Sequence, residues 1–303
     1  MTTEKSLKRL GVFAIFLAGC LWGTIGIFIH ALSDLGLSSV DIAFLRSLCA
    51  CLLFAVYLLL FRRAAFRVKW RDIWCFLGTG VASIAFFNFC YFATIEATSM
   101  AVAAILLYTS PVFVLLLSLP LFGERITPRK GVAILLVVVG CALVSGVMGG
   151  ISLGVPSLLL GLGAGFGYAL YSIFGRFAIS RGYRTDTINF YSFLFASIAL
   201  FPLTEPQKLQ IAVTSGASAI FFAAALALVA TLLPYVLYTF GLSRVENGIA
   251  AIVAGIEPVV AALVGVLFLH EQAPDLPTLV GILLVLLAIV LPNLPQKRKD
   301  GNV

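Results

Sequence analysis

The chain has 303 residues, of which 61% are apolar and 11% are charged, and its formal net charge is +7. Soluble domains carry about a quarter charged residues, so this composition excludes a water-soluble protein, including a soluble enzyme with one membrane anchor. The positive charge does not indicate binding to nucleic acid, because the basic residues are confined to short stretches between apolar runs.

Ten apolar segments follow one another along the chain. They cover residues 10–30, 40–61, 73–93, 101–121, 131–147, 155–175, 187–203, 217–240, 248–269 and 277–294. A bilayer crossing takes about 20 apolar residues, so ten crossings need about 200 residues and leave about 100 for ends and loops. The sequence therefore predicts an all-α, polytopic membrane protein with ten transmembrane helices.

The first segment follows Lys5, Lys8 and Arg9, a pattern that also precedes the cleavage cysteine of lipoprotein signals, here Cys20. Its apolar run continues to Ile29, so we interpret it as the first transmembrane helix. The six cysteines lie in apolar runs without the spacing of metal ligands. We expect them to be packing residues, and we expect neither a metal site nor a cofactor.

The basic residues outside the segments indicate on which side of the membrane each loop lies. With the N-terminus in the cytoplasm, 18 basic residues fall on the cytoplasmic side, Lys208 falls on the opposite side, and Arg46 lies inside the second segment. Cytoplasmic loops carry an excess of Lys and Arg. The distribution therefore predicts that both termini are cytoplasmic.

An internal repeat divides the chain into two halves of five helices, residues 1–150 and residues 151–303. Residues 91–124 align without a gap on residues 238–271 at an offset of 147. Because five is an odd number, the second half enters the membrane from the opposite side. Inverted repeats of this kind place a substrate site near the middle of the bilayer, between the halves.

Some matches within the repeat are hard to attribute to apolar composition alone. They are Pro111 with Pro258, Glu124 with Glu271 and, at an offset of 144, residues 19–23 with residues 163–167. The glycines of the last pair recur at a spacing of four, which predicts close helix packing and not a nucleotide loop. We expect each of the two glutamates to cap or anchor the helix that follows it.

Several short motifs stand in an order that is typical of one group of carriers. They are Arg46-Ser47, Pro111 followed by Gly123-Glu124, and Glu257-Pro258-Val259 followed by Glu271. With the two five-helix halves, they resemble the drug/metabolite transporter superfamily, most closely its bacterial ten-helix EamA-like branch. His270 departs from the family-like glycine. The resemblance implies a secondary carrier in the bacterial cytoplasmic (inner) membrane, where many relatives export amino acids or small metabolites.

Two charged residues, Arg46 and Glu257, lie inside apolar segments, where a charge costs about 3 kcal/mol. Arg46 is a candidate to attract a substrate carboxylate, and Glu257 to attract an amine or to carry a coupling proton. The alternative is that both are satisfied internally and that Arg46 extends to the outer interface. The repeat counterpart of Glu257 is Ser110, so the acid occurs in only one half, which favours a functional role.

Two prolines and a set of mostly aromatic residues complete the candidate site. Pro111 and Pro258 release the carbonyls of Leu107 and Ala254, so each is a candidate hinge beside a cavity or a simple kink. The candidate substrate-binding residues besides Arg46 and Glu257 are Trp22, Asn88, Tyr91, Tyr108, Tyr168, Tyr171, Tyr235 and Tyr238. Such rings offer apolar walls and a face for an ammonium group, although many aromatic residues in helices only pack.

These observations predict a transporter of small metabolites, with amino acids or organic amines favoured, that works by alternating access through a central cavity. Export is favoured only by the resemblance. The alternative is a flippase for a lipid-linked or amphipathic substrate, which a lateral opening between helices would favour. An enzyme is not expected, because only one acid lies deep in a segment and no nucleophile–base pair is evident. The expected partners are the small-molecule substrate and the lipid bilayer.

Overall fold

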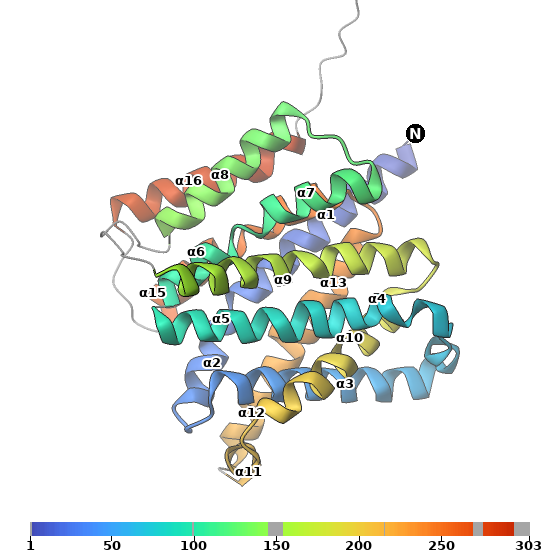
Figure 1. Cartoon of the computed structure of the whole chain (residues 1–303), viewed down its shortest axis with the longest axis vertical. Helices are drawn as coiled ribbons and strands as arrows, with labels where there is room; N and C mark the ends of the chain where they lie inside the picture. Colours follow the sequence, from blue (N-terminus) through green and yellow to red (C-terminus); the bar gives the residue numbers. More distant parts are fainter. Residues whose placement is uncertain (1, 99, 145–153, 215, 269–274, 294–303) are drawn as a thin grey trace, which may run out of the picture.

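The computed structural model describes residues 2–98, 100–144, 154–214, 216–268 and 275–293, and in these ranges every regular element is helical. The α-helices are α1 (Thr2–Gly23), α2 (Ile25–Ser33), α3 (Ser39–Phe61), α4 (Ile73–Leu77), α5 (Phe86–Ala97), α6 (Met100–Leu107), α7 (Ser110–Phe122), α8 (Pro128–Val144), α9 (Val155–Ser180), α10 (Thr185–Leu200), α11 (Pro206–Thr214), α12 (Ala217–Ala227), α13 (Leu233–Leu242), α14 (Asn247–Ala254), α15 (Glu257–Phe268) and α16 (Leu276–Val290). They form a bundle whose long helices run roughly side by side (Figure 1).

Eight helical stretches are long and apolar enough to cross a membrane. They are Lys5–Ser33, Ser39–Phe61, Trp70–Ala97, Val102–Phe122, Val155–Ser180, Thr185–Leu203, Ala217–Leu242 and Asn247–Phe268. The fifth and tenth predicted segments correspond to α8 and α16, which have 17 and 15 residues and lie against each other. Both predicted segments extend into residues outside the described ranges. The protein is thus an all-helical membrane protein, and ten crossings with cytoplasmic termini remain a prediction.

Helix contacts follow the internal repeat. The first helix of each half packs against the third and fourth segments of the other half: α1 lies on α13, α14 and α15, and α9 lies on α5, α6 and α7. The second segments, α3 and α10, pack together, as do the fifth, α8 and α16. The helices α1 and α9 run in opposite directions (Figure 1). This arrangement supports two interlocked halves of opposite orientation.

Short π-helical stretches interrupt the third segment of each half, at Gly78–Ala85 and at Leu228–Leu232. The repeat offset of 147 places the two stretches over each other. A π-helical turn widens the helix and is frequent at functional sites. Both stretches directly precede helices that carry candidate residues, α5 and α13, and nothing in the apolar pattern of the sequence signals them.

Glycines allow the crossing helices to approach closely, as their spacing predicts. Gly161 and Gly165 of α9 face α6, whereas Gly163 and Gly167 face α5. In the first half, a Cβ at Gly19 would lie 3.1 Å from the Ala254 carbonyl oxygen. In the second half, Gly165 faces the equivalent carbonyl, that of Leu107. The sequence alignment instead pairs Gly19 with Gly163. The structure therefore pairs Gly19 with Gly165, which changes the repeat offset at this crossing from 144 to 146.

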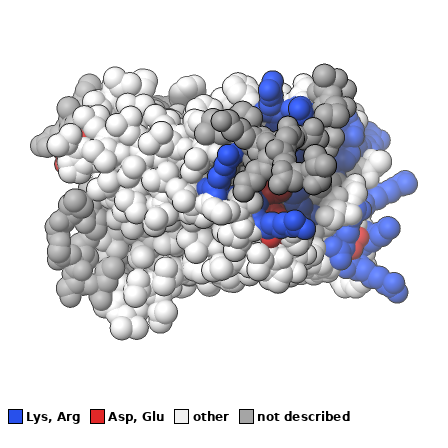
Figure 2. Space-filling view, turned by 90° about the horizontal axis from the view of Figure 1, so that it is seen from above, with Lys and Arg blue, Asp and Glu red and all other residues white. Residues whose placement is uncertain are grey.

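Charged side chains are unevenly distributed over the molecule. In Figure 2 the Lys and Arg side chains gather at one end, which we call the basic end, and the other end is almost devoid of them. The N-terminal part of α1 and the α3–α4, α7–α8, α9–α10 and α13–α14 connections lie at the basic end (Figure 1). The described basic loops that the sequence assigns to the cytoplasm therefore share one end.

Candidate functional site

The two proline-containing segments are broken, each directly before its proline. The first break separates α6 from α7 at residues 108–109, and the second separates α14 from α15 at residues 255–256. Pro111 and Pro258 have no N–H to offer to the carbonyls of Leu107 and Ala254. Each broken backbone is covered by a glycine-containing helix of the other half. The predicted interruptions are confirmed, and their use as hinges remains a proposal.

Glu257 is the first residue of α15, so its carboxylate lies at the helix end where the backbone N–H groups carry partial positive charge. The hydroxyl of Tyr168 on α9 donates to its Oε2 atom at 3.3 Å. The acid is therefore held by the end of its own helix and by a phenol group of the same half.

Five aromatic residues form a central aromatic cluster, in which rings from α1, α9 and α13 meet. They are Trp22, Tyr168, Tyr171, Tyr235 and Tyr238. The Trp22 ring centroid lies 5.2 Å from that of Tyr235, 5.4 Å from that of Tyr238 and 6.2 Å from that of Tyr168. The structure thus brings together five of the predicted site residues, although they are far apart in the sequence.

The cavity inside the central aromatic cluster is nearly filled. It measures about 10 Å³, and Ser83 and Phe87 complete its lining. About 10–15 Å³ is needed to hold a single water molecule. The wet central cavity expected from the sequence is therefore absent from the described residues in this conformation, because the aromatic rings pack against one another.

Two tyrosine hydroxyls of the cluster are bound by the protein itself. The Tyr171 hydroxyl donates to Asn189 Oδ1 at 2.6 Å and lies 2.8 Å from Thr239 Oγ1. The Tyr238 hydroxyl lies 2.8 Å from Ser172 Oγ. These hydrogen bonds give Tyr171 and Tyr238 a structural role in this conformation. The partners Asn189, Thr239 and Ser172 were not predicted, because single polar residues in apolar helices carry no distinctive pattern.

Arg46 is buried on α3 and does not extend to an interface, contrary to the alternative considered for it. It lines a second small cavity of about 20 Å³ together with Asn88. Its Nε atom has no hydrogen-bond partner among the described residues. Arg46 therefore lines a cavity separate from that of the central aromatic cluster.

Three other predicted residues, Asn88, Tyr91 and Tyr108, do not line the cavity of the central aromatic cluster. Asn88 lines the cavity of Arg46, but its amide donates to the Ile84 carbonyl of its own helix at 2.6 Å. Tyr91 packs its ring against Phe87. Tyr108 lies at the α6–α7 break and packs against an apolar cluster of α8 and α14–α16. These three residues therefore lie outside the lining of the small cavity in the central aromatic cluster.

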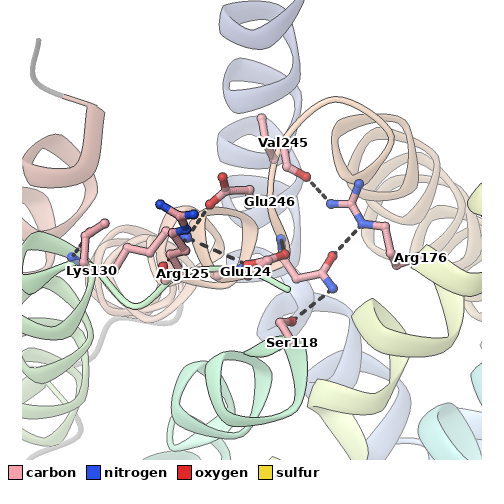
Figure 3. A network of polar contacts seen from close by, with 10 residues as sticks. Ser118, Glu124, Arg125, Lys130, Arg176, Val245 and Glu246 are labelled. Atoms are coloured by element: carbon pink, nitrogen blue, oxygen red, sulfur yellow. Dashed lines mark hydrogen bonds and ion pairs between the residues drawn. The ribbon is translucent and has the colours of Figure 1, made fainter. Parts of the chain in front are cut away.

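A second polar site, the basic-end network, joins the two halves at the basic end (Figure 3). It begins with Gly123, whose positive φ of 65° ends α7. The next residue, Glu124, accepts hydrogen bonds from the backbone N–H groups of Asn247 at 2.7 Å and Gly248 at 3.2 Å. Glu124 therefore caps α14 of the other half, and it also lies 3.9 Å from the Lys130 ammonium of the helix that follows it, α8. Its repeat partner Glu271 lies outside the described residues.

The rest of the basic-end network consists of charged groups around this cap (Figure 3). The Lys130 ammonium contacts the carboxylate of Glu246 and lies 3.9 Å from Glu124. Arg176 donates through Nε to Asn247 Oδ1 at 2.9 Å and also bonds the Val245 carbonyl. The Asn247 amide donates to Ser118 at 3.1 Å. Residues of α7, α8, α9 and α14 are thereby held together.

Comparison with known proteins identifies the fold and its general role. The sequence profile of the EamA-like transporter family matches the chain twice, over residues 9–146 and 155–294. The chain belongs to this family. Its two matched stretches agree with the duplicated architecture, and membership makes the protein a transporter of the drug/metabolite transporter superfamily and not an enzyme.

Relatives cover nearly the whole chain. An uncharacterized transporter of Archaeoglobus fulgidus is 29% identical, over 93% of this chain and 96% of that protein. The uncharacterized inner membrane transporter YicL of Salmonella typhimurium is 25% identical, over 96% and 97%. A solved structure titled only as a crystal structure of a protein shares the fold, with a TM-score of 0.78 at 19% identity over 95% of this chain and 96% of that one.

Proposed function

We propose that this EamA-like transporter is a secondary carrier that exports a small metabolite by alternating access, and that amino acids or organic amines are its favoured substrates. The observation that carries the proposal is the position of Glu257. It lies at the break between α14 and α15, is bonded by Tyr168, and adjoins the central aromatic cluster. A carboxylate inside a membrane-spanning segment costs free energy, and such residues commonly serve transport.

The chemistry of the site fits a substrate with an ammonium group. The carboxylate of Glu257 provides the opposite charge, and the rings of Trp22 and Tyr168 provide faces for a cation. Arg46, with a buried Nε that lacks a partner among the described residues, can form a charge-assisted contact with a substrate carboxylate. A zwitterionic amino acid would use both residues, whereas an amine would use only Glu257. Glu257 is also the candidate carrier of a coupling proton.

The proposed cycle requires the small central cavities to enlarge. Cavities of about 10 and 20 Å³ are far below the size of a metabolite, so we propose that this structure is a closed conformation. The breaks before Pro111 and Pro258 are the proposed hinges, because the backbone is already uncoupled there. The flippase alternative is less favoured, because the central aromatic cluster is enclosed by helices α1, α5, α9 and α13 instead of facing lipid.

Counterflow in proteoliposomes tests this proposal. Vesicles preloaded with individual amino acids, amines or nucleosides are screened for accelerated uptake of the same labelled compound, first with the natural chain and then with Glu257→Gln. We expect an amino acid or amine to give counterflow and the variant to lose it by about 10-fold or more, as loss of a hydrogen bond to a charged group costs about 1.5–3 kcal/mol.

The matched control is Glu205→Gln, which removes a carboxylate from an exposed position on the α10–α11 connection. It should transport at the natural rate. If Glu257→Gln transports every hit at the natural rate and with the natural pH dependence, the role assigned to Glu257 is wrong.

A further inference from the structure

A large cavity opens at the basic end, outside the proposed transport site. It measures about 1110 Å³, against about 10 Å³ within the central aromatic cluster. Its walls come from the N-terminal part of α1, the α7–α8 connection, the start of α14 and the end of α16. Its lining includes Lys5, Lys8, Arg9, Phe13, Arg125 and Ile289.

The charge of this basic-end cavity is strongly positive. Six cationic side chains and two carboxylates line it. Both carboxylates, Glu124 and Glu246, already interact with Lys130 in the basic-end network. Among the residues that the structure describes, none forms an ion pair with the side chains of Lys5, Lys8, Arg9 or Arg125. Within the described part of the chain, the cavity therefore presents four cationic side chains that are not ion-paired with a carboxylate.

The same cavity has an apolar wall. Val12, Phe13 and Phe16 of α1 line it, as does Ile289 of α16. The Phe13 side chain is 61% exposed, so the wall continues into the apolar outer surface of the bundle. On α1 the cationic residues lie one to two turns before these apolar residues. The order along the helix thus matches that in a bilayer, where the charged headgroup layer lies outside the acyl chains.

We propose that the basic-end cavity binds the phosphate headgroup of an anionic phospholipid, with an acyl chain along the wall formed by Phe13 and Ile289. Basic pockets between transmembrane helices recognise such headgroups. The apolar wall distinguishes a lipid from a free phosphate compound, which would use the cations alone. The bound phosphate would contact Lys8, Arg9 and Arg125, which all line this cavity.

Native mass spectrometry of the full chain in detergent tests the proposal. The probes are dioleoyl phosphatidylglycerol, dioleoyl phosphatidylcholine, glycerol phosphate and inorganic phosphate. We expect one phosphatidylglycerol molecule to bind at least about 10-fold more tightly than phosphatidylcholine. The triple variant Lys8→Gln, Arg9→Gln and Arg125→Gln should reduce this preference to near one. Glycerol phosphate and inorganic phosphate should compete weakly.

A matched control separates the site from general charge. The triple variant Arg62→Gln, Arg67→Gln and Lys69→Gln removes the same charge from exposed positions of the α3–α4 connection that do not line the cavity, and it should keep the preference. Equal losses in both triple variants would overturn the proposal. Full displacement of phosphatidylglycerol by glycerol phosphate or inorganic phosphate would also overturn it and would indicate a small-anion site.

Gel filtration and thermal unfolding establish that each variant is folded before binding is measured. If the cavity triple variant does not fold, the single variants Arg9→Gln and Arg125→Gln are compared with Arg62→Gln. An unchanged lipid preference in both cavity variants would then contradict the proposal. Loss of the preference in them but not in Arg62→Gln would support it. Neither result depends on transport activity.

Discussion

The central aromatic cluster and the basic-end network both hold the two halves together, but they do so by different means. In the centre, aromatic rings pack against one another, and one of them, Tyr168, donates its hydroxyl hydrogen to Glu257. At the basic end, Glu124 caps a helix of the other half, and Lys130 and Arg176 add charged contacts. Water can replace the polar contacts when they separate, whereas separation of the rings exposes apolar surface. We therefore expect the helices at the basic end to separate more readily than those in the centre.

The strongest effect on the basic-end network is expected from Glu124→Gln. The change leaves the start of α14 without its anionic cap and Lys130 without one buried partner, since the side chains of Glu124 and Lys130 are each only 7% exposed. We expect position 115, which lies on α7 and is buried against α14, to become accessible to water. Introduced as Leu115→Cys in a chain with its native cysteines replaced, it should react about 10-fold faster with a soluble maleimide.

The control for this experiment is Glu205→Gln in the same Leu115→Cys chain, where the reaction rate should not change. An unchanged rate in Glu124→Gln would show that the helix cap does not hold α7 and α14 together, and the contrast between the two regions would fail.

A smaller effect is expected from Arg176→Lys. The guanidinium contacts both Asn247 and the Val245 carbonyl, and a lysine ammonium cannot reproduce this forked geometry. The maleimide reaction at Leu115→Cys should accelerate roughly three-fold, about half the free-energy effect of Glu124→Gln. Arg62→Lys, at an exposed position, is the matched control. A larger effect than that of Glu124→Gln would mean that Arg176, not the helix cap, dominates the network.

The smallest effect is expected from Tyr171→Phe in the centre. Its hydroxyl bonds Asn189 and Thr239, so the variant should lose about 1 kcal/mol of stability in thermal unfolding and keep its substrate preference in counterflow.

Tyr168→Phe provides the contrast, because it removes the hydroxyl that donates to Glu257. This variant should change the transport rate more than the stability. The reverse pattern would exchange the roles assigned to the two tyrosines.

Sequence patterns predicted what depends on local order along the chain. Apolar segments predicted the helices, and the prolines predicted the two breaks. The glycines at a spacing of four predicted that α1 and α9 each pack closely against helices of the other half. The aromatic candidates Trp22 and Tyr235 meet because the repeat places their helices between the halves. The apolar segments, prolines and glycines recur at regular spacings or at equivalent positions of the repeat, so they can be recognised in the sequence alone.

Features that depend on tertiary contacts could not be predicted. Glu124 follows α7 but caps α14, because only the folded chain brings these segments together. The filled centre reflects the conformation adopted, which no spacing of Trp22 or Tyr168 encodes. The π-helical stretches before Phe86 and Leu233 leave the apolar pattern of the sequence unchanged.

The most direct test of alternating access is the reactivity of position 168 from each side of the membrane. A Tyr168→Cys chain with its native cysteines replaced is reconstituted in proteoliposomes, and an impermeant thiol reagent is added outside or trapped inside. We predict reaction from both sides, slowed in each case by a substrate that gives counterflow. Reaction from one side only, or from neither, would contradict a central site that opens in turn to the two faces.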